Sequence, residues 1–286
     1  MSQLLRVQNF GVSSDGFGAG EGQSLERPFG HANPAELMGW AFATASFPNR
    51  TAPGGSRGLD DYLTRDFSHN IGAEIMGAHK FSPHRGPWQD HEWQGWWGDE
   101  PPFHTPVFVM THHLRPSFTL SDTTFHFTDE APAAVLEQAR QAAEGKDVRL
   151  GGGATTIRQF LDADLVDTLH VAVAPLELGS GARLWESPDE LRDRFHVDVV
   201  PSASGVVHHL FWRKSAAVGA HADSMPTPPM TARAPPSMPS YRSSLPAPRA
   251  RPQCGRRPAT TRAVSDERET LTYELFGTAS RELAQQ

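Results

Sequence analysis

The chain contains Val148-Arg149-Leu150-Gly151-Gly152-Gly153-Ala154-Thr155-Thr156-Ile157, a short apolar segment followed by three glycines and the start of a helix. The helix continues with Phe160 and Leu161, which fall on the same face as Ile157. Glycines between a strand and a helix let the backbone approach a ligand, and the N–H groups of the helix favour an anion such as a phosphate. A glycine run alone also describes a plain tight turn, so the rest of the chain has to decide between the two interpretations.

Strands and helices are expected to alternate on both sides of this turn. Expected strands are residues 4–10, 73–77, 106–111, 124–128, 148–151 and 169–175, and expected helices are residues 35–45, 60–70, 132–143 and the helix after Gly153. Residues 195–200 and 206–212 are expected to form a closing antiparallel pair. The order predicts an α/β fold with a mostly parallel twisted sheet, flanked by helices, and an antiparallel C-terminal edge.

In such a sheet, ligands bind beyond the carboxyl ends of the strands. Four expected strand ends carry small or polar residues, namely Asp15, Gly77, Thr111 and Gly151. Four independent positions at one edge of the sheet favour a ligand site more than the glycine run does by itself.

Composition excludes several classes of protein. The 286 residues carry a net charge of −7, which argues against nucleic-acid binding, and no apolar run reaches the roughly 18 residues of a membrane span. One cysteine excludes an internal disulfide and, with no signal-peptide pattern at the start, favours the cytoplasm. We expect a folded domain at residues 1–214. Residues 215–286, rich in Pro, Ser and Arg, are expected to be a disordered tail with a possible short helix at 267–285.

Several motifs resemble one known family. They are the glycine turn with its helix, Asp164-Leu165-Val166-Asp167-Thr168-Leu169-His170, Ala174-Pro175-Leu176-Glu177-Leu178-Gly179-Ser180-Gly181 and Ser13-Ser14-Asp15-Gly16-Phe17. Together with Ile75-Met76-Gly77 they resemble the reductase domain of riboflavin biosynthesis, the RibD C-terminal domain, within the dihydrofolate reductase-like superfamily. The resemblance covers about residues 3–213.

The resemblance implies a dihydrofolate reductase-like three-layer fold that binds NADPH and reduces a small heterocyclic or sugar-derived substrate, pterin- or pyrimidine-like. The residues that match the cofactor-binding loops of the family are Gly77, Ala78, His79, Lys80, Thr111, His112, His113, Gly151, Gly152, Gly153, Ala154 and Thr155. Family members commonly carry Arg at the position of Ala78. The choice of NADPH over NADH therefore depends on Lys80, His79 and His113 as cations for the 2′-phosphate.

Asp15 is the expected catalytic acid, because it lies where the nicotinamide ring would rest. A partly desolvated Asp has a raised pKa and can position a proton near neutrality. The alternative is an Asx-turn residue that only caps its own loop.

Phe17, Trp40 and Trp97 are the expected substrate contacts, with the tryptophan-rich residues 82–105 as an apolar lid. The alternative for these tryptophans is packing against the sheet or a dimer contact. The histidines at 84, 91, 104, 112 and 113 do not predict a metal site, because adjacent His112 and His113 on an extended segment point in opposite directions.

The leading hypothesis is thus an NADPH-dependent reductase, and the alternative is a nucleotide-binding module of the same fold without turnover. A homodimer is expected, because family members pair through their terminal strands and the apolar Leu210-Phe211-Trp212 suits such a contact. The identity of the substrate does not follow from the sequence.

Overall fold

The computed structural model describes residues 3–48, 54–84, 86–88 and 92–214. The predicted tail at 215–286, with its possible helix, lies outside the described residues, as does His91.

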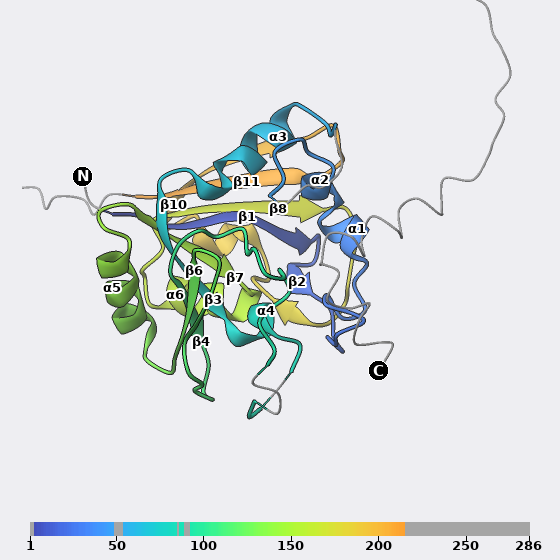
Figure 1. The fold of residues 1–286 in the computed structure, drawn as a ribbon. Coiled ribbons are helices and arrows are strands. Elements are labelled where there is room, and N and C mark those ends of the chain that lie inside the picture. The colour runs from blue at the N-terminus through green and yellow to red at the C-terminus, as the bar shows by residue number, and fades with distance from the viewer. Residues whose placement is uncertain (1–2, 49–53, 85, 89–91, 215–286) are drawn as a thin grey trace, which may run out of the picture. The chain divides into compact units, whose positions relative to one another are not determined.

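In the described part of the chain, nine strands form one mixed sheet in the order β10-β11-β8-β1-β7-β3-β4-β6-β5 (Figure 1). The strands are β1 (Leu5–Ser13), β3 (Ile71–Gly77), β4 (Val107–Met110), β5 (Phe118–Leu120), β6 (Thr123–Thr128), β7 (Asp147–Gly152), β8 (Thr168–Ala174), β10 (Phe195–Pro201) and β11 (Val207–Arg213). The six strands from β8 to β6 pair in parallel, whereas β10, β11 and β5 pair antiparallel with their neighbours. The predicted α/β fold with an antiparallel C-terminal edge is confirmed.

The helices are short apart from two. They are α1 (Pro34–Leu37), α2 (Gly39–Phe42), α3 (Leu59–Thr64), α4 (Ala78–Phe81), α5 (Pro132–Ala142) and α6 (Ala154–Asp162), with 3-10 turns at Arg65–Ser68 and Pro188–Leu191. The single helix expected at 35–45 is in fact α1 and α2, which part at Met38 before a glycine of low helix propensity. The helix expected at 60–70 ends at Thr64 and continues as a 3-10 turn.

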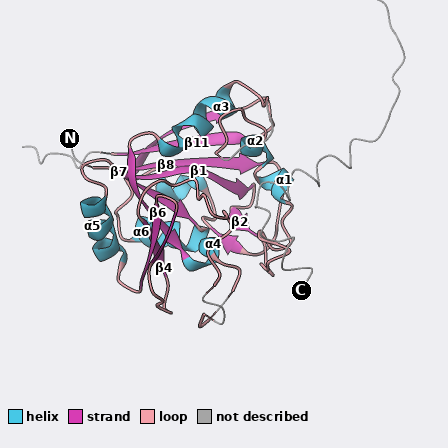
Figure 2. Cartoon of the chain, viewed as in Figure 1, coloured by secondary structure: helices cyan, strands magenta, loops and turns pink. Residues whose placement is uncertain are grey.

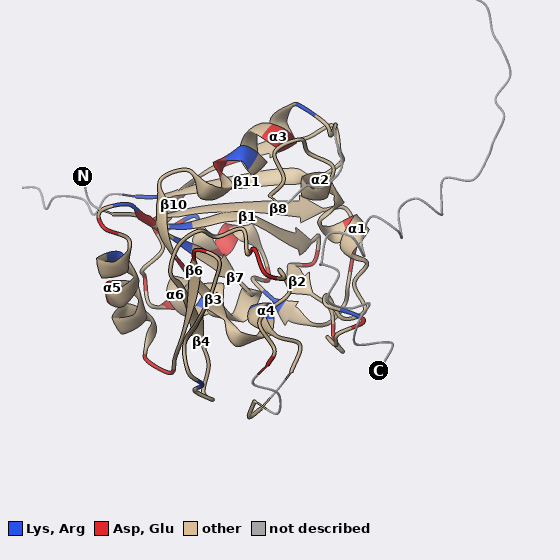
Figure 3. Ribbon diagram, in the orientation of Figure 1, with Lys and Arg blue, Asp and Glu red and all other residues tan. Residues whose placement is uncertain are grey.

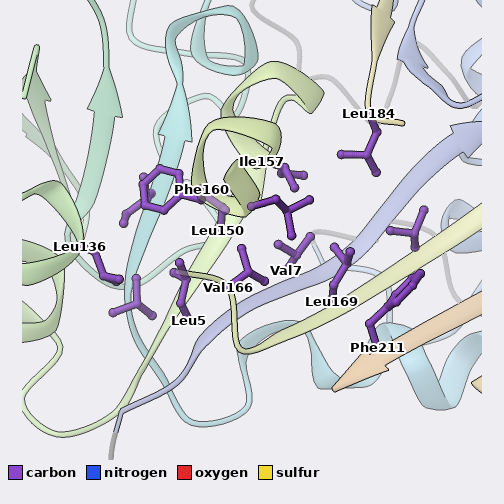
Figure 4. Packing of buried hydrophobic residues seen from close by; sticks show 14 of the residues in the cluster. Leu5, Val7, Leu136, Leu150, Ile157, Phe160, Val166, Leu169, Leu184 and Phe211 are labelled. Carbon is purple, nitrogen blue, oxygen red and sulfur yellow. The ribbon is translucent and has the colours of Figure 1, made fainter. Parts of the chain in front are cut away.

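Apolar side chains on both faces of the sheet hold three layers together. On one face, α5 and α6 pack over β1, β3, β7 and β8, and Figure 4 shows Leu150, Ile157, Phe160 and Leu169 meeting there. On the other face, α1 and α2 cover β8 through a cluster that includes Leu37. Phe81, at the end of α4, packs over β4 and β6 with the tryptophan-rich segment. This is the expected arrangement of helices on both faces of a parallel sheet.

A small ribbon of β2 (Phe17–Ala19) and β9 (Ala182–Arg183) pairs antiparallel beside the main sheet (Figure 2). The parallel strands β1, β3, β4 and β7 end at Ser13, Gly77, Met110 and Gly152. These ends lie at one edge of the sheet, at or next to the positions predicted from the sequence.

Candidate active site

A cavity of about 690 Å³ opens at the carboxyl ends of these strands. All the predicted cofactor-binding residues except Gly152 line it, so the structure brings together segments from β3, β4 and β7 that lie up to 78 positions apart in the chain. Further lining residues that the argument uses are Asn9, Phe10, Thr64, Trp97, Arg149 and Thr156.

The N-terminus of α6 faces this cavity. Its N-cap is Gly153, and no side chain accepts a hydrogen bond from the first turn. A Cβ atom built on Gly153 would meet nothing within 4 Å, so space is open in front of the N–H groups of Ala154 and Thr155. An uncapped helix N-terminus with open space beside it has the geometry that can accept a phosphate group.

The two glycines before α6 are constrained in different ways. Gly152 has a φ of +108°, and a Cβ there would lie 2.8 Å from Cε2 of Phe10. The Gly152–Gly153 peptide bond is cis. A Cβ on Gly77, at the end of β3, would lie 2.1 Å from Oγ1 of Thr156 in α6. Glycine at Gly77 therefore lets β3 approach α6 closely enough to place both segments in one cavity wall.

A buried carboxylate and two cations form the floor beside these glycines. Glu74 in β3 pairs with Arg149 in β7, and its Oε1 accepts a hydrogen bond from Nζ of Lys80 at 3.0 Å. The side chains of Glu74 and Arg149 are 2% and 3% exposed, and that of Lys80 is 28% exposed. Burial lowers the pKa of Lys80; the Glu74 carboxylate opposes this shift and the Arg149 guanidinium adds to it. When all three groups are ionised, the cluster carries one net positive charge next to the cavity.

Asp15 lies in the turn after β1 and does not belong to the described residues that line the cavity. Its carboxylate accepts hydrogen bonds from the Ser13 hydroxyl at 2.6 Å and from the N–H groups of Leu178 and Gly179 at 3.1 and 2.7 Å. Burial acts to raise the pKa of Asp15, but these hydrogen bonds outweigh it and hold the pKa below the ordinary value of 3.8. The direction of this pKa shift is opposite to that expected of a proton donor. The carboxylate also does more than cap its own loop, because it joins the turn after β1 to the distant Leu178–Gly179 backbone.

The three expected substrate contacts are placed differently from one another. Trp97 lines the cavity, where it stacks on Phe125 at 6.1 Å and packs edge-on against Phe103. Phe17 and Trp40 are 5% and 4% exposed and are not among the described lining residues. The guanidinium of Arg183 lies 4.4 Å from the Phe17 ring, and Trp40 packs on His170 and His208. The structure therefore shows packing contacts for both residues, and their role as substrate contacts stays a prediction.

His112 and His113 are exposed at the rim of the cavity. Within the described ranges, no group of three or more His, Cys, Asp or Glu side chains could hold a metal ion. In those same ranges no helix is long and apolar enough to cross a membrane. Charged residues are scattered along the described ribbon (Figure 3).

Sequence reasoning missed Asn9, Glu74 and Arg149. Each is a polar residue inside an expected strand, Glu74 and Arg149 in strands that are otherwise apolar or glycine, and each lies next to the cavity or in its wall. A polar residue in a buried strand requires a partner, and this was the signal that could have identified them.

The family RibD C-terminal domain matches residues 7–201. The chain belongs to the RibD C-terminal domain family. As a member of this family it is an NADP(H)-dependent oxidoreductase with NADPH as its cofactor. The uncapped N-terminus of α6 and the open space at Gly153 fit the pyrophosphate of such a cofactor.

Solved structures of related proteins also match. A putative riboflavin biosynthesis protein from Shewanella sp. PV-4 is 18% identical, with a TM-score of 0.42, over 75% of this chain and 100% of that one. A pyrimidine reductase-like protein from Corynebacterium diphtheriae is 13% identical, with a TM-score of 0.42, over 75% of this chain and 93% of that one. A diaminohydroxyphosphoribosylaminopyrimidine deaminase/5-amino-6-(5-phosphoribosylamino)uracil reductase from Thermotoga maritima is 12% identical, with a TM-score of 0.42, over 74% of this chain and 57% of that one. No curated protein matches the chain.

Proposed function

We propose that this RibD C-terminal domain protein transfers a hydride from NADPH to a small heterocyclic or sugar-derived substrate of the aminouracil class. The observation that carries the proposal is the cavity, which joins an uncapped helix N-terminus to a deeper wall of aromatic and polar side chains. The bound cofactor would supply the hydride, and the protein would bind, orient and exclude water.

Distinct parts of the cavity suit the two ligands. The backbone N–H groups at Gly153, Ala154 and Thr155 would bind the cofactor pyrophosphate. His79 and His113 are exposed at the rim of the cavity, where they would contact the 2′-phosphate of the cofactor. Trp97 would provide a flat apolar wall for a ring, because its own ring already stacks in the cavity lining.

Cofactor binding tests this directly through Gly153. Gly153→Asp places a carboxylate in the open space in front of α6, whereas Gly153→Asn places a neutral group of the same size there. Both Asp and Asn are good N-cap residues, so neither variant should destabilise the helix. Charge repulsion should weaken NADPH binding by Gly153→Asp, relative to Gly153→Asn, by about 1.5–3 kcal/mol, or roughly ten- to a hundred-fold in Kd.

Fluorescence titration with NADPH, with NADH alongside, measures the two affinities. Equal affinities of Gly153→Asp and Gly153→Asn for NADPH would show that the pyrophosphate does not bind at the N-terminus of α6. Tight NADPH binding with no turnover on any aminouracil, pterin or aldehyde would favour the nucleotide-binding module instead.

We also propose a homodimer in the cytoplasm. Val199 on β10 and Trp212 on β11 are 48% and 42% exposed on the antiparallel edge of the sheet, which supports pairing through this hairpin. Light scattering of the purified protein gives the mass, and a monomer at micromolar concentration would contradict the proposal.

A further inference from the structure

A chain of hydrogen bonds runs through the sheet from Asp60 to the cavity. Nε2 of His208 on β11 lies 2.8 Å from Oδ1 of Asp60 on α3. Nδ1 of His208 lies 3.0 Å from Nε2 of His170 on β8. Nδ1 of His170 in turn meets Asn9 on β1, with the backbone N–H of Asn9 at 3.3 Å and its side-chain amide at 3.0 Å. Asn9 lines the cavity.

The two histidines in the middle of the chain are shielded from water, whereas the Asp60 side chain at its end is 13% exposed. His208 is 0% exposed and His170 is 8% exposed, and the buried ring of Trp40 packs edge-on against both at 5.2 and 5.8 Å. The Asp60 carboxylate also accepts hydrogen bonds from Ser202 and Ser204. Buried polar groups of this kind are kept only where every member has a partner, so the chain specifies one arrangement.

Asn9 occupies an irregular position in β1. The register with β8 shifts between Val7 and Phe10, and Asn9 has a φ of +54°. Bulges next to ligand sites re-aim a side chain, and Asn tolerates the left-handed conformation better than most residues. The bulge therefore turns Asn9 toward the cavity, on the side of Thr64.

The groups at the two ends of the chain, the backbone N–H of Asn9 and the carboxylate of Asp60, determine which ring nitrogen of each histidine carries the proton. The backbone N–H of Asn9 can only donate, so Nδ1 of His170 accepts. Burial lowers the pKa of His170 to about 3, so this ring is neutral and its single proton is on Nε2. Nε2 then donates to Nδ1 of His208, and His208 donates from its own Nε2 to the ionised Asp60. All donors point from the cavity toward Asp60.

The same logic orients the carboxamide of Asn9. Oxygen and nitrogen of a carboxamide are assigned from the hydrogen-bond network. Oδ1 of Asn9 is placed 3.0 Å from Nδ1 of His170, and its Nδ2 is placed 3.4 Å from the Thr64 carbonyl. Because Nδ1 of His170 already accepts from the backbone N–H of Asn9, it cannot donate to this oxygen, so we assign the carboxamide in the reversed orientation, with N–H2 beside His170 and the oxygen on the side of the Thr64 carbonyl. Two acceptor oxygens at this distance are stabilised by one donor group that bridges them.

We propose that Asp60, His208 and His170 act as positioning residues that hold Asn9 as a hydrogen-bond acceptor in the cavity wall, where it receives an N–H group of the substrate's heterocycle. The proposal rests on the proposed function, because it names the substrate edge that the reductase recognises. The N–H groups meant are those of the exocyclic amino groups of an aminouracil; 5,6-dimethyluracil, a ring of the same size, keeps its ring N–H groups but lacks these.

The spectroscopic test does not depend on turnover. Nitrogen-detected NMR of the full chain, with histidine assignments from His170→Gln and His208→Gln, should show the His170 ring neutral, with its proton on Nε2, at neutral pH. In Asp60→Asn the side-chain oxygen of the Asn can still accept from Nε2 of His208, and the backbone N–H of Asn9 still donates to Nδ1 of His170, so the proton of His170 should stay on Nε2. A wild-type His170 ring protonated on Nδ1 would overturn the proposal.

The binding test uses 5,6-diaminouracil against 5,6-dimethyluracil, titrated calorimetrically into the NADPH complex. Wild type and the control Asp198→Asn, an exposed carboxylate on the neighbouring β10, should prefer the diamino ring about tenfold, as one hydrogen bond of roughly 1.4 kcal/mol requires. Asn9→Ala, and His170→Leu, which removes the acceptor that orients the carboxamide, should lose this preference at an unchanged Kd for NADPH. No preference in wild type, or a preference kept in Asn9→Ala, would refute the assignment. Failure of wild type to bind NADPH would instead refute the proposed function.

Discussion

Neutralising Glu74 should destabilise this protein strongly, because the carboxylate is the shared counterion of two cations. Glu74→Gln would leave the guanidinium of Arg149, whose side chain is 3% exposed, without its ionic partner. Burial lowers the pKa of Arg149 and Glu74 opposes that shift, but guanidinium does not lose its proton in proteins. The Lys80 side chain is 28% exposed and can turn its ammonium group toward the cavity, so the loss of the carboxylate costs less free energy at Lys80 than at Arg149.

The magnitude follows from this asymmetry. Removing one partner of a buried ion pair costs about 3–5 kcal/mol, a large part of the roughly 5–15 kcal/mol that stabilises a typical domain. At about 2–4 °C per kcal/mol for a domain of this size, the Tm should fall by roughly 6–20 °C. Replacing both partners, as in Glu74→Met with Arg149→Met, should restore most of the loss, since no uncompensated buried charge remains.

Urea denaturation and calorimetry measure these variants, with the exposed Glu177→Gln as the matched control. The reasoning is refuted if Glu74→Gln unfolds within about 1 kcal/mol of the control. It is also refuted if the double variant loses as much as the sum of the two single variants, because the pair would then not be coupled.

Three further predictions concern single positions. The pKa of His170 is about 3 in the folded protein and 6.5 ordinarily, so between pH 3 and pH 6.5 only the unfolded chain binds this proton. The free energy of unfolding should therefore rise with pH in that range, by at most about 1.4 kcal/mol per pH unit, and stay level above it. Urea titrations from pH 3 to 8 should show a flatter slope for His170→Gln, and an equal slope would contradict the assignment. Asp15→Asn should cost about 1–3 kcal/mol at pH 7, because Asn cannot accept from both Leu178 and Gly179; since the folded pKa lies below 3.8, this difference should vanish as the pH falls through it, while NADPH affinity stays within twofold. Gly77→Ala should weaken NADPH binding at least tenfold, because its Cβ would lie 2.1 Å from Oγ1 of Thr156; Gly39→Ala, whose Cβ would meet nothing within 4 Å, is the control.

The cofactor half of the site could be predicted from local sequence alone. A glycine turn before a helix creates free N–H groups through backbone geometry, which depends on neighbours in the chain, and parallel strands necessarily end at one edge of the sheet. The lining residues Gly153, Ala154 and Thr155 follow from these two rules.

The substrate half could not be predicted in the same way. Trp40, within the helix expected at 35–45, is a predicted substrate contact, and in the structure it packs on His170 and His208. Asp15 looked like an acid because of its position at a strand end, but its carboxylate meets two N–H groups more than 160 residues away. Partners this distant in the chain determine the pKa and the direction of a side chain, and no local pattern contains them.

The amino-acid sequence by itself determined the fold class, the order of the strands' apolar and polar positions, and the anion site at the start of α6, because each depends on periodicity or backbone freedom within a few residues. Only the tertiary structure decided which polar residues became partners. Glu74 meets Arg149 across 75 positions, and His170 meets Asn9 across 161. The physical reason is that a buried charge or ring nitrogen is stabilised by whatever the packed sheet brings within about 3 Å, and strand pairing brings these groups together irrespective of their separation in the chain.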